Sequence, residues 1–86
     1  MNLPAIPDWL QQRGGELRPG YDGLTVYVCL EKEPQYELVP VPVKGRHGCR
    51  ITQTVNGKPI PCAAVCATVD EALRGGLEDL RKALGW

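Results

Sequence analysis

The sequence predicts an α+β fold: an antiparallel sheet of three to four strands, with a C-terminal amphipathic helix packed on one face and a short N-terminal helix. Three observations predict it. Apolar residues alternate over 24–31, Asn56-Gly57 is a strong hairpin signal, and leucines recur every three or four residues over 69–84. The 86 residues fit one domain, divided into an N-terminal helix and Gly-rich loop (1–23), the sheet (24–66) and the C-terminal helix (68–86).

Residues 4–13 form the first expected element, a short helix. Asp8 is a suitable N-cap, and Ile6, Trp9 and Leu10 would form one apolar face. Gly14-Gly15 is expected to end this helix. The next residues, up to 23, contain further glycines and a proline and are predicted to be a loop.

The first predicted strand, 24–31, places Val26, Val28 and Leu30 on one face. Residues 33–36 fit a type I turn, and a second strand is expected over 36–43. Pro40 and Pro42 lie two residues apart, so both missing N–H groups fall on the same flank of that strand. The second strand should pair with the first through its odd-numbered residues, and its proline flank near 40–42 should be an edge or leave the sheet.

Residues 44–48 are predicted to be a turn, followed by a third strand over 49–55. Asn56-Gly57 should connect it to a fourth strand over 58–62, with an extension to 66 left open. The expected core combines strand and helix residues: Val26, Val28, Leu30, Ile51, Val55, Leu73, Leu77, Leu80 and Leu84.

The C-terminal helix is expected over 69–84, because Thr68 and Glu71 form a capping box. Its polar face offers two i,i+4 ion pairs, Asp70–Arg74 and Glu78–Lys82. Gly75-Gly76 is unusual there, since each glycine costs about 1 kcal/mol relative to alanine in a helix. We expect close packing against the sheet, around Trp9 or Tyr27, in preference to a surface that admits a partner.

Charge and composition restrict the function. Ten basic residues balance ten acidic ones, so the global positive field that draws a protein to nucleic acid is missing. No apolar run is long enough to cross a membrane, and the N-terminal residues do not resemble a signal peptide. We therefore expect a cytoplasmic protein with reduced cysteines and no membrane partner.

Catalytic and metal signatures are weak. His47, Cys49, Cys62 and Cys66 could supply zinc ligands, but the usual pair of thiolates is separated by two residues and here the spacings are one and three. Buried thiols are the favoured interpretation. The sequence contains one histidine and no serine, so a serine-based triad is excluded. The prediction is a non-enzymatic protein without metal or cofactor.

The sequence is compatible with two classes of function. The first is an interaction or regulatory module that binds a protein partner or forms a homodimer, with Tyr27, Tyr36, Val39 and Val41 as candidate surface. The alternative is a nucleic-acid- or anion-binding module. Its candidate residues cluster around the 44–50 turn and the following hairpin: Lys44, Arg46, His47, Arg50 and Lys58.

Three segments resemble HicB-type antitoxins. The strand from Val26 to Glu31 is similar to the opening strand of that family, Val41-Pro42 with Gly48-Cys49 resembles its Pro…Gly-Cys element, and residues 68–73 resemble its helix start. The resemblance implies a degenerate ribonuclease-H-like sheet that binds a partner protein and performs no catalysis. The chain departs from the family over residues 50–67, where the family is more compact.

Overall fold

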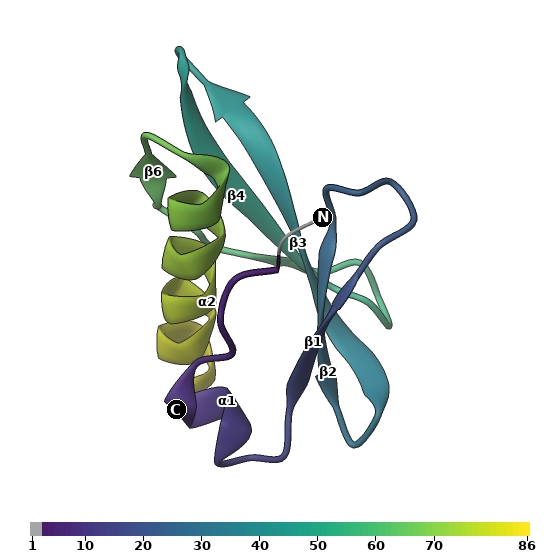
Figure 1. The fold of residues 1–86 in the computed structure, drawn as a ribbon. Helices are drawn as coiled ribbons and strands as arrows, with labels where there is room; N and C mark the ends of the chain where they lie inside the picture. The colour runs from purple at the N-terminus through teal and green to yellow at the C-terminus, as the bar shows by residue number, and fades with distance from the viewer. Residues whose placement is uncertain (1–2) are drawn as a thin grey trace.

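A computed structural model describes residues 3–86 and shows an α+β fold with one antiparallel sheet (Figure 1). The strand order is β1-β2-β3-β4-β5, and β6 also pairs with β4. The sheet has six strands where the sequence predicted three or four. The elements are α1 (Asp8–Gln11), β1 (Glu16–Pro19), β2 (Val26–Leu30), β3 (Glu33–Val43), β4 (Arg46–Gln53), β5 (Pro59–Ile60), β6 (Val65–Cys66) and α2 (Val69–Leu84).

The N-terminal helix is shorter than predicted. It covers Asp8–Gln11 rather than 4–13, and Asp8 is its first residue because Pro7 holds the N-cap position. The Gly15 N–H donates to the Leu10 carbonyl, which closes the end of the helix. Residues 16–19, predicted to be a loop, instead form β1 along the edge of β2, with Leu17 opposite Val28 and buried.

Two tight turns set the beginning of β3 and β4. Glu31 and Lys32 both have positive φ (53° and 67°), so they form a two-residue turn and β3 begins at Glu33. The predicted turn at 33–36 is therefore wrong. Lys44 and Gly45 repeat this geometry with φ of 46° and 80°, and β4 begins at Arg46 instead of 49.

The prolines of β3 limit its pairing on one flank only. β2 accompanies β3 as far as Leu38, and beyond that point Pro40 and Pro42 face only β4. Because Val43 and Arg46 close a two-residue turn, the odd-numbered residues of β3 exchange hydrogen bonds with β4 and the even-numbered ones with β2. The predicted edge at Pro40 and Pro42 is thus confirmed, but the predicted odd-numbered pairing with the first strand is wrong.

The segment after β4 forms a longer turn and two short strands. The Gln53 N–H donates to the Lys58 carbonyl across a four-residue turn in which Gly57 has a φ of 69°. The predicted fourth strand is divided into β5 and β6. Val55 lies in the turn and is 80% exposed, so its assignment to the core is wrong.

Helix α2 has the predicted limits. The Thr68 Oγ1 accepts a hydrogen bond from the Glu71 N–H at 3.2 Å, which is one half of the predicted capping box. The Glu71 carboxylate accepts from the Thr68 hydroxyl at 3.0 Å instead of from the Thr68 backbone N–H. On the polar face Arg74 pairs with Asp70 at 2.5 Å, while Glu78 pairs with Arg81 rather than with the predicted Lys82.

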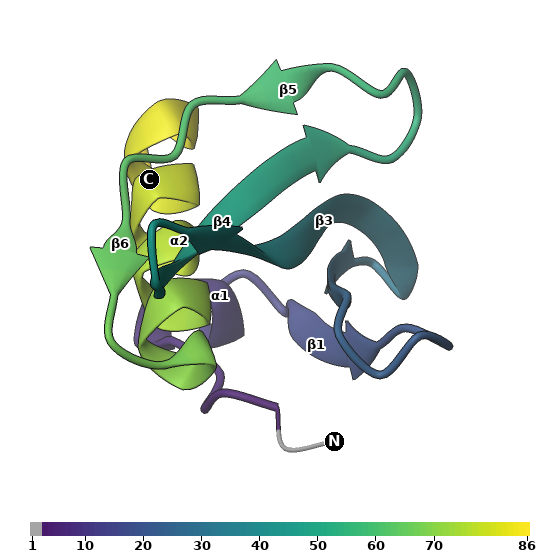
Figure 2. The same cartoon turned by 90° about the horizontal axis from the view of Figure 1, so that it is seen from above.

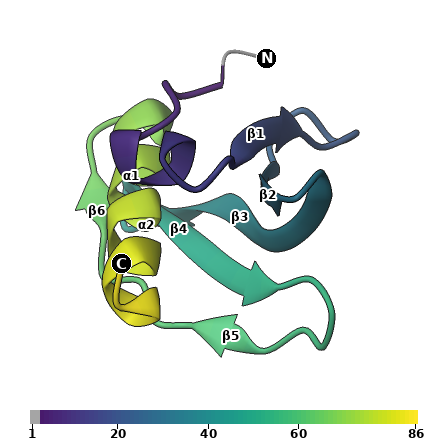
Figure 3. The same ribbon diagram turned by 90° about the horizontal axis from the view of Figure 1, so that it is seen from below.

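The core lies between α2 and the sheet, with α1 closing one end. Figures 2 and 3 show both helices on the same side of the strands. Leu30 and Leu84 are only partly buried and pack against this core. Its fully or nearly buried members include three leucines that the sequence did not predict: Leu10, Leu17 and Leu38 join Val26, Val28, Cys49, Ile51, Leu73, Leu77 and Leu80.

The two tryptophans join the N-terminal helix to the C-terminal residue. The rings of Trp9 and Trp86 pack with centroids 5.8 Å apart at an interplanar angle of 57°. The guanidinium of Arg13 lies 4.1 Å from the Trp86 ring centroid. The C-terminus accordingly lies beside α1 (Figure 1). A tilted aromatic pair with a cation over one face is a favourable arrangement.

Candidate functional site

The face of the sheet that carries α2 is closed by tight packing. A Cβ built on Gly76 would lie 2.6 Å from the Cys49 Sγ, and one built on Gly75 would lie 2.7 Å from the Ala64 Cβ. The two glycines therefore serve packing, as the sequence predicted, but their neighbours are not Trp9 or Tyr27. No room remains on this side for a partner at the middle of the helix.

Within residues 3–86, neither helix lies on the opposite face of the sheet (Figures 2 and 3). Alternation along the strands assigns side chains to it, because residues opposite one another in the register share a face. We call this surface the outer face and define it by Tyr27, Glu37, Val39, Val41, Val43, Arg46, Gly48, Arg50, Thr52 and Val65.

Valines form the centre of the outer face. Val41, Gly48 and Val65 lie opposite one another on three adjacent strands. A Cβ on Gly48 would lie 2.9 Å from the Val43 Cγ2 and 3.5 Å from the Val41 Cγ2, so both valines lean over the glycine. Gly48 is buried beneath them, while Val65 is 46% exposed. The result is an apolar patch that crosses β3, β4 and β6.

Polar side chains surround this patch. The Glu37 carboxylate accepts a hydrogen bond of 2.9 Å from the Thr52 hydroxyl on the neighbouring strand. Arg50 lies opposite Val39, and Arg46 lies opposite Val43, both exposed. Glu37 is thus at one end of the patch and Arg46 at the other.

The outer face continues toward β1 as a shallow hollow of about 280 Å³. Tyr27 and Arg18 lie on adjacent strands at its wall, and Tyr21 from the β1–β2 connection lies at its rim, fully exposed. Sequence reasoning missed Arg18 and Tyr21 because β1 was predicted to be a loop. It also missed Val43, although the alternation of Val39 and Val41 continues to it.

The predicted partner surface is brought together only in part. Tyr27, Val39 and Val41 all lie on the outer face. Tyr36 does not, because it lies opposite Val28 and packs against the core beneath α2. Tyr36 is an even-numbered residue of β3 and therefore points to the opposite side from Val39.

The five basic residues are not gathered into one patch. Lys44 and Arg46 lie at the β3–β4 turn, and Arg50 lies further along the outer face. His47 alternates to the helix side, where it lies opposite Cys66. Lys58 follows the turn at the far end of β4, next to Gln53.

The metal candidates divide into two pairs. His47 lies opposite Cys66 on β6, whereas Cys49 lies beneath Gly76 with the Cys62 thiol beside it. Within residues 3–86, no three histidine, cysteine or acidic side chains come close enough together to hold a metal ion.

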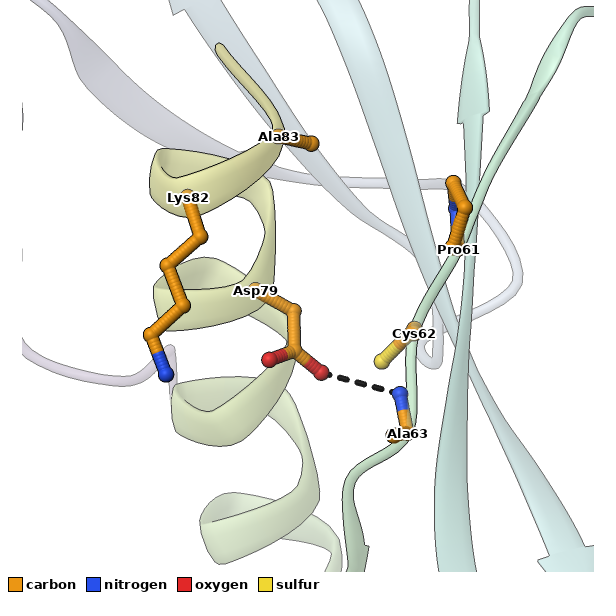
Figure 4. Close-up of a pocket in the computed structure, with 6 residues that line it drawn as sticks. All are labelled: Pro61, Cys62, Ala63, Asp79, Lys82 and Ala83. Atoms are coloured by element: carbon orange, nitrogen blue, oxygen red, sulfur yellow. Dashed lines mark hydrogen bonds between the residues drawn. The ribbon is translucent and has the colours of Figure 1, made fainter. Parts of the chain in front are cut away.

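Cys62 lines an open hollow of about 500 Å³ between the residues after β5 and the end of α2 (Figure 4). The Ala63 N–H donates a hydrogen bond of 2.9 Å to the Asp79 carboxylate, which fastens this segment to the helix. Lys82 and Ala83 form the helical wall. Of the four cysteine thiols, only that of Cys62 lines this hollow.

Burial governs the chemistry of the two neighbouring thiols. It raises the pKa of Cys49 to about 12, and the adjacent Cys62 contributes in the same direction. Burial also raises the pKa of Cys62. Since the thiolate is the nucleophile and metal ligand, both groups are predominantly inert thiols near neutral pH.

Comparison with protein-family models, curated proteins and solved structures finds no match to this chain. The resemblance to HicB-type antitoxins therefore stays a prediction from the sequence. Among residues 3–86, neither helix is both long and apolar enough to span a bilayer.

Proposed function

We propose that this protein is a small non-enzymatic interaction module that binds another protein through the outer face of its sheet. The observation that carries the proposal is the apolar patch of Val39, Val41, Val43 and Val65, which neither helix covers. Contiguous apolar surface of this kind, rimmed by charged residues, is typical of protein-binding sites.

The edges of the sheet support binding at the face over binding by strand addition. β1 has four residues and ends in Pro19, and β5 has two residues and begins at Pro59. The free flank of β3 carries Pro40 and Pro42. Proline removes the N–H groups that an added strand would need, so a partner gains little by pairing at these edges.

The thiols support a role without catalysis. Their raised pKa values leave little thiolate at Cys49 and Cys62, and His47 lies opposite Cys66, in a different pair. An activated cysteine nucleophile needs a lowered pKa or an adjacent base in hydrogen-bonding reach. The valines of the outer face are the better-developed feature.

The test is site-specific photo-crosslinking in cell extract. A photo-activatable phenylalanine analogue replaces Val41 in one variant and the exposed Val55 in a matched control. We expect a protein crosslinked from position 41 that is displaced by excess unlabelled protein and lost when Val65→Glu is added. Equal crosslinking from positions 41 and 55, or insensitivity to Val65→Glu, would contradict the proposal.

The alternative, nucleic-acid binding through Lys44, Arg46, His47, Arg50 and Lys58, is tested in the same preparation. Binding that neutralises phosphates weakens steeply between about 50 and 200 mM salt, whereas apolar association does not. We expect added RNA to leave the sedimentation of the protein unchanged at both salt concentrations, because the five residues are divided among two faces and both ends of β4.

A further inference from the structure

We infer that the partner of the outer face is a second copy of this chain, stacked face to face with the two β3 strands antiparallel. This inference rests on the proposed function and specifies its partner. Three features of the outer face favour a second copy: the order of charges along β3 and β4, the apolar patch between these charges, and the size of the face.

Charges of opposite sign lie at the two ends of the outer face, with Glu37 at one end and Arg46 at the other. Glu37, Val39, Val41 and Val43 follow one another at intervals of two residues, each about 7 Å apart along the strand. A two-fold axis that crosses β3 at Pro40 relates the level of Glu37 to the level of Val43. Glu37 then lies over Val43 of the other copy, and Arg46, which is paired with Val43 on β4, is one strand spacing away and within reach of the Glu37 carboxylate.

The same axis places the middle of the patch against itself. Val39 of one copy lies at the level of Val41 in the other, so valines meet valines across the two-fold axis. Arg50 lies at the level of Gly48 of the second copy. Because Gly48 has no side chain, the aliphatic part of Arg50 can contact Val41 of that copy.

The opposite orientation, with the β3 strands parallel, is disfavoured. A two-fold axis along β3 would bring Glu37 directly over Glu37, and like charges in contact repel. The antiparallel stack is therefore the arrangement in which the charges of this face complement a second copy of the same face.

The size of the face fits a reversible dimer. The molecule extends 36 × 27 × 26 Å, so one broad side approaches the area of about 800 Å² per partner in standard interfaces. Only four valines and Tyr27 supply the apolar part of this face. We therefore expect a dimer that is weaker than most dimers with an interface of this area.

Sedimentation equilibrium of the full chain from about 1 µM to 1 mM measures this association. We expect a monomer–dimer equilibrium that Val41→Glu abolishes and the matched surface variant Val55→Glu leaves unchanged. Thermal unfolding followed by circular dichroism verifies that both variants are folded.

A charge exchange tests the orientation. Glu37→Lys and Arg46→Glu should each weaken the dimer about tenfold, and the double variant should return the association to within about twofold of the original protein. A larger loss in the double variant than in either single variant would overturn the antiparallel stack.

Failure of this inference is distinguishable from failure of the proposed function. A chain that stays monomeric at about 1 mM overturns the second-copy inference. If position 41 then still crosslinks to a different protein in a manner sensitive to Val65→Glu, the proposed function stands. If neither association depends on the outer face, both are overturned.

Discussion

Gly76 of α2 lies so close to Cys49 of β4 that a Cβ on the glycine would be only 2.6 Å from the thiol sulfur. A glycine, which disfavours helix formation, thus lies where α2 approaches β4 closely. The neighbouring Leu38 Cδ2 would lie 3.2 Å from the same Cβ, so the space is closed from two directions.

Gly76→Ala should destabilise the protein by about 1–3 kcal/mol, because overpacking of the core outweighs the gain in helix propensity of about 1 kcal/mol. Urea unfolding measures the difference. Adding Cys49→Ala removes the sulfur and should recover part of the loss. If Gly76→Ala alone were stabilising, the close approach of α2 to β4 would be contradicted.

Lys32→Gly should stabilise the protein by about 0.5–1 kcal/mol. Lys32 has a φ of 67° in the turn between β2 and β3, a conformation that glycine adopts without the steric penalty of a side chain. Lys58→Gly is the control, because Lys58 lies outside the positive-φ residues of the described chain. Thermal unfolding of both variants should show opposite changes, and equal changes would argue against this turn.

Asp22 should make stability depend on pH at the acid end. Hydrogen bonds from the Thr25 hydroxyl, and from the N–H groups of Thr25 and Leu24, lower the pKa of Asp22 from 3.8 to about 2. A depressed carboxyl pKa contributes stability that is present above pH 3.8 and is lost as pH falls toward 2.

The pH dependence of stability is compared with that of the Asp22→Asn variant, whose amide side chain does not titrate. The stability advantage of the original protein over this variant should shrink between pH 4 and pH 2. Carbon-13 NMR of the Asp22 carboxyl gives its pKa directly, and Thr25→Val should raise this pKa because the hydrogen bond from the Thr25 hydroxyl is removed. Titration of Asp22 near pH 3.8 in the original protein would contradict the assignment.

The cysteines should behave as structural thiols. At pH 8, Cys49 should react with a disulfide reagent far more slowly than in the unfolded chain, because its folded pKa is about 12. Zinc should leave the melting temperature unchanged, and Cys62→Ser with Cys66→Ser should leave metal content unchanged. Stoichiometric zinc in the purified protein would show that the ligand pairs rearrange.

The elements that were predicted correctly are those with a long, regular pattern of residues in the sequence. The capping box at Thr68 and the leucine spacing defined α2, and alternation defined most of β2. In both cases many residues repeat the same preference, so the tertiary environment has little to override. The free flank of β3 at Pro40 and Pro42 also followed from the sequence, because a missing N–H is a property of the residue itself, whereas the neighbour of its other flank did not.

The remaining features depend on contacts between distant segments. β1 contains one apolar residue, Leu17, and exists because β2 supplies its hydrogen-bonding partner. The turn at Glu31 and Lys32 contains neither glycine nor asparagine, so nothing local indicates it. The predicted interaction surface included Tyr36 together with Val39, although residues three apart on a strand point to opposite sides.

The pairing of Trp9 with Trp86 has a practical consequence for optical work on this protein. These are the only two tryptophans in the sequence, and both are at the same corner of the fold with Arg13 over one ring. Intrinsic tryptophan fluorescence will therefore report whether α1 stays in contact with the C-terminal residue, and it will be nearly blind to events at the valines across the sheet. A fluorophore introduced near Tyr27 would give the second, independent signal.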